Sequence, residues 1–153
     1  MPTHAQVVVL PEESGPLQIQ DVALPDPGPT QVVVQQYASG VCHSQLHQMH
    51  RPRKNPVLLG HESTGIVIRK GSAVTHLDEG DTVLVTWVPR DAANTHTTPS
   101  AAILDVDGGQ AISQNVFTWA DHTIADQQFV VKADASIKKD VTAIIGCAVM
   151  TGA

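Results

Sequence analysis

Short valine-rich segments, each closed by a proline or glycine turn, constrain the fold of this chain more than any other feature. Residues 6–10 and 31–38 each carry three valines in succession, and residues 17–22 alternate apolar and polar side chains. β-Branched residues and period-two alternation are typical of strands. Residues 25–29 read PDPGP and break the chain between two of these segments, because proline fixes φ and withdraws a backbone donor.

The same signal recurs through the rest of the chain. Further strands are predicted at 65–69, 82–88, 116–120 and 128–131. Many short strands with turns between them, in a chain of 153 residues, predict a single mainly β domain with short helices. We therefore expect a small, partly open β-barrel.

Two stretches favour short helices and one favours irregular structure. Residues 42–49 form a plausible helical turn, and Asp140 is a suitable N-cap for a short apolar helix over 141–145. Residues 89–115 change in composition to Ala, Thr, Asp and Gly. That change predicts an irregular excursion over the surface.

The composition excludes several classes of protein. Apolar residues make up 42% and charged residues 16%, and no apolar run approaches the ~20 residues that a membrane-spanning helix needs. The formal net charge is −6, and the only tight basic group is Arg51, Arg53 and Lys54, so nucleic acid is not an expected partner. The N-terminus lacks a basic segment followed by a long apolar one, so we expect a cytoplasmic protein with reduced thiols.

Three side chains suit a zinc ion. Cys42 and His61 each follow an apolar run and a glycine-containing turn, and Cys147 lies near the other end of the chain. A lone cysteine is commonly a small buried hydrophobe, but two thiolates and an imidazole together form a zinc ligand set. Structural zinc sites use four protein ligands, whereas three leave a position for water or substrate. The count points to a catalytic site.

The motifs that carry these residues resemble a known family. They read GVCHS at 40–44, LGHESTG at 59–65, GDTV at 80–83, and Gly-Cys at 146–147 followed by Thr-Gly at 151–152. This chain resembles the N-terminal catalytic domain of zinc-dependent medium-chain alcohol dehydrogenases. The resemblance implies a GroES-like barrel over residues 1–153.

In that family a Rossmann domain normally follows the barrel. No Gly-x-Gly-x-x-Gly fingerprint occurs in this sequence. We therefore expect the first half of such an enzyme, with residues 140–153 starting the helix that connects to a cofactor domain.

The resemblance also implies a role for individual residues around the metal. Cys42, His61 and Cys147 would be the zinc ligands. Glu62 would be a carboxylate that approaches the metal when water or product exchanges; its structural alternative is a buried carboxylate paired with an arginine.

Four further residues correspond to positions that contact substrate or cofactor. Ser44 would contact the substrate alcohol and pass its proton to His47 at the surface, with a helix cap as the structural alternative for Ser44. His43 would reach the cofactor pyrophosphate, and Thr151 would lie against the nicotinamide.

The sequence departs from the family at two places. Gln45 stands where an aspartate is usual near the zinc, which changes the hydrogen bonding and charge beside the metal. Residues 89–115 contain no cysteine, so we expect one catalytic zinc and no structural zinc. Trp87 and Trp119, both on strand patterns, are expected in the core.

The function that follows is reversible oxidation of an alcohol to an aldehyde or ketone, with hydride transfer to NAD or NADP. The chain alone is expected to be monomeric and inactive, and the full-length enzyme a homo-oligomer. The alternative is a zinc-binding or interaction module with the same barrel and no chemistry. A zinc-free reductase would not need Cys42, His61 and Cys147 together.

Overall fold

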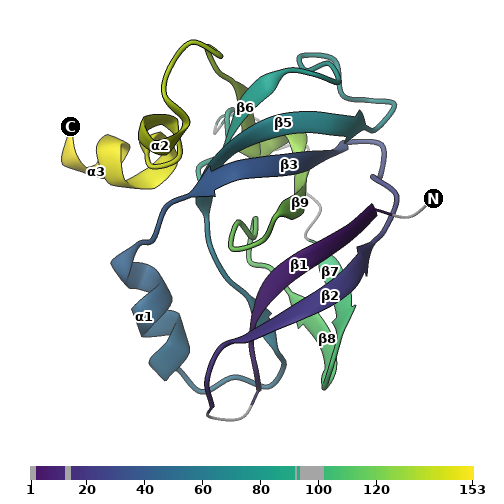
Figure 1. Cartoon of the computed structure of the whole chain (residues 1–153), viewed down its shortest axis with the longest axis vertical. Coiled ribbons are helices and arrows are strands. Elements are labelled where there is room, and N and C mark those ends of the chain that lie inside the picture. The colour runs from purple at the N-terminus through teal and green to yellow at the C-terminus, as the bar shows by residue number, and fades with distance from the viewer. Residues whose placement is uncertain (1–2, 13–14, 92, 94–101) are drawn as a thin grey trace.

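The computed structural model describes residues 3–12, 15–91, 93 and 102–153, which form two five-stranded sheets that wrap into a partly open barrel (Figure 1). The strand order is β2-β1-β4-β8-β7 in one sheet and β10-β6-β5-β3-β9 in the other. The strands are β1 (Thr3–Leu10), β2 (Gln18–Leu24), β3 (Gln31–Ser39), β4 (Val57–Leu58), β5 (Glu62–Lys70), β6 (Thr82–Thr86), β7 (Ile103–Val106), β8 (Gly109–Ile112), β9 (His122–Asp126) and β10 (Val130–Lys132). The predicted fold class is confirmed.

The helical elements are short. They are α1 (His43–His50), the 3₁₀ turn η1 (Gln127–Phe129), α2 (Lys139–Thr142), the π-helical turn η2 (Ile145–Val149) and α3 (Met150–Gly152). The predicted helix at 42–49 is confirmed as α1. The second helix begins at Lys139 rather than Val141, and its N-cap is Lys138, so Asp140 lies inside the first turn. Helix α2 packs against β3 and β5, and η2 packs against β5 and β6. No helix among the described residues is long and apolar enough to cross a membrane.

Strand β3 lies between two hydrophobic clusters, which explains its run of three valines. Successive side chains of a strand point to opposite faces. Val33 therefore packs in the cluster that contains Leu104 and Phe117, while Val32 and Val34 pack in the other. A strand that is buried on both faces needs apolar residues at every position, and this requirement overrides alternation.

Residues 116–121 join the two sheets without forming the predicted strand at 116–120. The O atom of Trp119 accepts a hydrogen bond from Val8 N at 2.8 Å, and the O atom of Asp121 accepts one from Gln36 N at 2.8 Å. A single bridge pairs Ala120 with Val7. The strand itself starts later, at His122, where β9 pairs with β3. Through these bonds the segment connects β1 of one sheet with β3 of the other.

The prediction of an irregular segment over 89–115 is wrong for residues 103–112. Strands β7 and β8 form a hairpin there, in which Leu104 pairs with Ala111 and both side chains are buried in the first cluster. The polar residues that suggested a surface loop lie on the outer face of the hairpin. Asp107-Gly108 occupies its turn, and this dipeptide is a strong hairpin signal between apolar segments.

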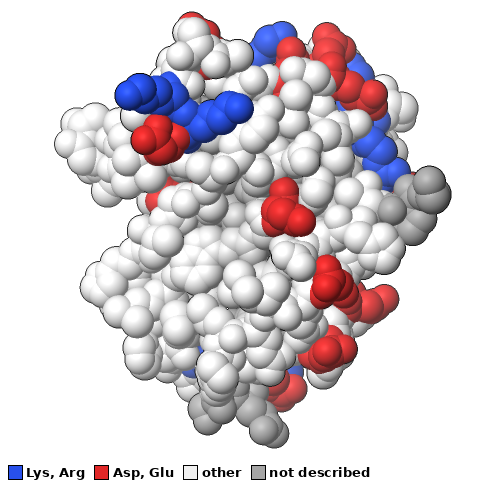
Figure 2. All heavy atoms as spheres, in the orientation of Figure 1, with Lys and Arg blue, Asp and Glu red and all other residues white. Residues whose placement is uncertain are grey.

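The charged groups are distributed unevenly over the surface. In Figure 2 most of the visible acidic side chains lie toward the right, where β2 and β7 run. Helix α1 contains no ionised carboxylate or ammonium group, and no acidic side chain is visible around it at the lower left. On the face that Figure 2 shows, the acidic side chains therefore lie away from α1.

The hairpin is expected to contribute to stability as part of the core. Leu104 is 1% exposed and its neighbour Ile103 is 51% exposed. Leu104→Ala should lower the free energy of unfolding by roughly 2–5 kcal/mol, because it removes buried methyl groups and leaves a cavity. Ile103→Ala is the matched control and should change it by about 0.5 kcal/mol or less. Urea denaturation followed by tryptophan fluorescence measures both, and equal effects would contradict the assignment of the hairpin to the core.

Candidate metal centre

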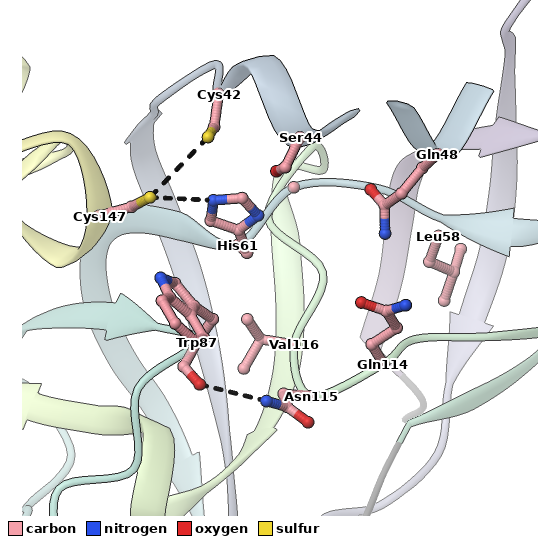
Figure 3. A pocket seen from close by; sticks show the side chains of 11 residues that line it. Cys42, Ser44, Gln48, Leu58, His61, Trp87, Gln114, Asn115, Val116 and Cys147 are labelled. Carbon is pink, nitrogen blue, oxygen red and sulfur yellow. Dashed lines mark hydrogen bonds between the residues drawn. The ribbon is translucent and has the colours of Figure 1, made fainter. Parts of the chain in front are cut away.

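The structure brings together all three predicted zinc ligands (Figure 3). The ligand atoms of Cys42, His61 and Cys147 all lie within 4.8 Å of one another. His61 Nε2 is 3.2 Å from Cys147 Sγ, which is 3.9 Å from Cys42 Sγ. These residues come from the start of α1, from the turn between β4 and β5, and from η2. Segments far apart in the sequence thus converge on one point.

Two glycines allow this convergence. A Cβ at Gly40, two residues before Cys42, would lie 2.5 Å from Cδ of the buried Glu62, so any other residue here would have to displace this carboxylate. Gly60, just before His61, has φ of 90°, which side chains rarely adopt, and a Cβ there would lie 2.6 Å from Trp119 N. The glycine before each ligand is therefore a requirement of the backbone.

Hydrogen bonds on both sides of Cys147 hold the turn that carries it. Thr86 Oγ1 donates to the O atom of Gly146 at 2.6 Å, and Ala148 N donates to Glu62 Oε2 at 3.1 Å. Thr86 ends β6 and Glu62 begins β5. The π-helical turn is thus fastened to two neighbouring strands, which fixes the position of the thiol.

Glu62 lies behind the ligand cluster and is 1% exposed. The structural alternative for Glu62 was a pairing with an arginine. Among the described residues, Oε2 instead accepts a hydrogen bond from the backbone N–H of Ala148. Among the same residues the buried Oε1 has no hydrogen-bond partner. A buried carboxylate oxygen without a partner is unfavourable, and a cation beside it would reduce that cost.

The residues present fit a zinc ion. Zn–S bonds of about 2.3 Å and Zn–N bonds of about 2.0–2.1 Å at tetrahedral angles place ligand atoms roughly 3.6–3.8 Å apart. The separations of 3.2 Å between His61 and Cys147 and 3.9 Å between the two thiols lie close to these values, and all three ligand atoms lie within 4.8 Å of one another. Sulfur and imidazole nitrogen are also the donor types that zinc prefers. Both the donor set and its spacing thus suit this metal.

The environment shifts the pKa of each ligand. Hydrogen bonds from the hydroxyl and the backbone N–H of Ser44 lower the pKa of the Cys42 thiol. Burial lowers the pKa of His61, against the opposing charge of Glu62. Burial raises the pKa of Cys147, and its hydrogen bond with Cys42 adds to this. Cys42 is therefore the thiol that ionises first, and His61 is neutral at neutral pH, as a metal ligand must be.

Gln45 contacts two of the ligands from behind. It is 2% exposed, its Oε1 accepts from Cys42 N at 2.8 Å, and its Nε2 lies 2.6 Å from His61 Nδ1. Cys42, rather than Ser44, is the N-cap of α1, and the bond to Gln45 is the return bond of a capping box. Ser44 is therefore not the cap of this helix, which was the structural alternative for it, and Gln45 lies next to two of the predicted ligands.

A pocket of about 350 Å³ opens in front of the cluster (Figure 3). Its lining includes the three ligands and Ser44, together with Leu58, Gly60, Trp87, Val116 and the amide side chains of Gln48, Gln114 and Asn115. The expectation that Trp87 lies in the core is wrong, since it is 46% exposed and lines this pocket. Trp119 is half-buried, and its Nε1 donates to the O atom of Gly40 at 3.1 Å.

The remaining predicted residues lie outside the pocket lining. His43 and His47 are exposed on α1 with ring centroids 4.9 Å apart, and Thr151 is exposed on α3. Their predicted contacts with a proton relay or a cofactor stay predictions. Sequence reasoning missed the contribution of Trp87 and of Gln114 and Asn115 to the pocket. Strand β6 ends at Thr86, so Trp87 has left the sheet where the strand pattern still continued.

Comparison with known proteins agrees with this geometry. The alcohol dehydrogenase GroES-like domain family matches residues 28–135. An alcohol dehydrogenase of Rhizobium meliloti (strain 1021) is 36% identical over 155 residues, an alignment that covers 94% of this chain and 44% of that protein. The chain thus spans less than half of that relative.

Solved structures share the fold. A zinc-binding domain protein of the alcohol dehydrogenase type from Burkholderia ambifaria superposes with a TM-score of 0.82 at 20% identity, over 99% of this chain and 48% of that one. Benzyl alcohol dehydrogenase from Acinetobacter calcoaceticus superposes with a TM-score of 0.79 at 22% identity, over 98% and 46%. With its converging ligands, its barrel and these matches, the chain belongs to the alcohol dehydrogenase GroES-like domain family.

Proposed function

We propose that this chain is the zinc-binding catalytic domain of an alcohol dehydrogenase that oxidises an alcohol reversibly to an aldehyde or ketone. The observation that carries the proposal is the cluster of Cys42, His61 and Cys147 at the wall of an open pocket. Three ligands leave one tetrahedral position facing that pocket. Such an open position is typical of catalytic zinc and not of structural zinc.

A bound zinc would supply Lewis acidity, which lowers the pKa of an alcohol hydroxyl at the site. Ser44 lines the pocket beside Cys42 and can accept the hydroxyl proton. His47 lies three residues further along α1, so the two side chains project from the same side of the helix one turn apart. Being exposed, His47 can release the proton to solvent.

The substrate would lie against the apolar part of the pocket. Leu58, Trp87 and Val116 contribute apolar surface close to the ligands, and the volume of about 350 Å³ suits a small alcohol. Hydride transfer requires a nicotinamide cofactor, NAD or NADP, which a further domain would hold. Residues 139–152, with His43 and Thr151, would lie toward that domain.

A second candidate function is a zinc-binding or interaction module without chemistry. The contact that favours it is the neutral amide of Gln45, whose NH₂ group faces the ring of His61 where an acceptor would support metal ligation. Both candidates bind zinc and neither predicts turnover by the chain alone, so turnover separates them only in a protein that also carries a cofactor domain.

The three ligands are expected to hold one zinc ion per chain. Native mass spectrometry should detect one bound zinc in the unmodified protein and none in Cys147→Ser, because the variant keeps only two of the three ligands that the zinc site needs. His47→Ala is the matched control: it removes a nearby exposed imidazole and should keep the zinc. Retention of zinc by Cys147→Ser would contradict the ligand assignment.

The chain alone is expected to show no turnover. It contains no dinucleotide-binding fingerprint, so the nicotinamide is not held over the pocket. Zinc-loaded protein incubated with NAD⁺ and primary or aromatic alcohols should produce no absorbance at the NADH wavelength above that of a zinc-only control. A full-length alcohol dehydrogenase assayed in parallel verifies the conditions. Clear turnover by the chain would contradict the need for a further cofactor domain.

A further inference from the structure

The side-chain amide of Gln45 is held in one orientation by the backbone of α1. Its Oε1 lies 2.8 Å from Cys42 N and its Nε2 lies 2.6 Å from His61 Nδ1. A backbone N–H can only donate, so the group that faces Cys42 must be the amide oxygen. The NH₂ group is therefore the one that faces the imidazole, and this assignment follows from the hydrogen-bond network itself.

This orientation dictates where the proton of His61 sits. An amide NH₂ can only donate, so Nδ1 must accept and carries no proton. A neutral imidazole has one N–H, which then lies on Nε2. Nε2 faces Cys147 Sγ at 3.2 Å, where it donates to the sulfur. The metal-free site is thus closed by hydrogen bonds from Gln45 through His61 to the thiol.

The same arrangement opposes metal binding. Nε2 is the nitrogen that faces the thiol of Cys147, so it is the atom that would ligate zinc, and a ligating nitrogen carries no proton. The proton must then move to Nδ1, where it would point at the NH₂ group of Gln45. Two donors facing each other at this distance is unfavourable in a buried site.

We propose that Gln45 is a positioning residue that holds His61 in the tautomer unable to ligate zinc, so that zinc binding requires the amide to reverse. Reversal turns Oε1 toward Nδ1–H and the NH₂ group toward Cys42 N. It therefore loses the bond from Cys42 N that begins α1 and brings two donors together there, so the cost of ligation is moved to the start of this helix. The inference rests on the zinc site of the proposed function and adds a control on its occupancy.

The proposal predicts that an acceptor at both positions relieves the conflict. Glutamate has the length of glutamine and two oxygen acceptors, so in Gln45→Glu one oxygen accepts from Cys42 N and the other from Nδ1–H. Partners of metal-bound histidines commonly change metal affinity 10–100-fold. We expect Gln45→Glu to bind Zn²⁺ about 10–100-fold more tightly than the unmodified chain in competition with a chromophoric chelator.

Gln48→Glu separates this effect from that of added charge. Gln48 lies on the same helix and lines the same pocket, and its buried Oε1 has no hydrogen-bond partner in the described part of the chain. The variant adds one negative charge near the metal without an acceptor for Nδ1. It should gain only what charge alone provides, and equal gains in the two variants would overturn the proposal.

The decisive readout is the tautomer of His61 in the metal-free protein. Long-range ¹H–¹⁵N correlation spectra distinguish a proton on Nε2 from one on Nδ1, at about pH 8 where an ordinary imidazole is neutral. The proton should be on Nε2 in the unmodified chain and in Gln48→Glu, and on Nδ1 in Gln45→Glu and after addition of Zn²⁺. A proton on Nδ1 in the unmodified, metal-free chain would overturn the proposal even if a variant failed to fold. A chain that binds no Zn²⁺ would instead overturn the proposed function and leave the tautomer measurable.

Discussion

Glu62 is the residue on which the arrangement of the site depends. Its backbone O atom accepts a hydrogen bond from Gly40 N at 3.0 Å, which fixes the approach to Cys42. Its buried carboxylate accepts one from Ala148 N through Oε2 at 3.1 Å, which fixes the turn that carries Cys147. It also follows His61 directly in the chain. One residue therefore positions all three ligands, and the glycine at position 40 exists because the carboxylate occupies the space where a side chain would be.

A carboxylate in this place has an electrostatic consequence for the ligands. Hydrogen bonds from Ser44 lower the pKa of Cys42 and burial raises the pKa of Cys147, and in both cases the nearby charge of Glu62 acts against ionisation of the thiol. A divalent cation among them reverses the balance, because it attracts the thiolates and the carboxylate together. Without a cation the buried Oε1 has no partner within the described part of the chain. The site thus favours a positive charge beside Glu62, and no described residue donates to Oε1.

The sequence was enough to predict the barrel and the three side chains that converge at the pocket, because each depends on a local pattern. Cys42 and His61 sit in short glycine-containing motifs, and the valine runs predicted β1, β3 and β6. It was not enough where tertiary contacts decide. The β7–β8 hairpin was missed because the Ala, Thr, Asp and Gly content of residues 89–115 was given more weight than the Asp107-Gly108 turn signal, and the burial of Leu104 and Ala111 depends on contacts with distant segments. Trp87 was assigned to a strand that ends one residue earlier. The orientation of the Gln45 amide depends on its contacts with Cys42 N and with His61 Nδ1. No sequence pattern indicates which end of an amide faces which group.

Gln45 and Glu62 divide between them two tasks that a single acidic residue behind the histidine could perform together. Glu62 supplies the negative charge that favours a cation, but its hydrogen bond goes to Ala148 N. Gln45 reaches the ring of His61, but as a neutral donor. The charge that attracts a metal and the hydrogen bond that sets the tautomer of His61 therefore come from different residues in this chain. Only the hydrogen bond from Gln45 opposes ligation of zinc by His61. The free-energy cost of binding zinc is thus concentrated in the reversal of one amide at the start of α1, while the electrostatic attraction of Glu62 for the metal is unaffected.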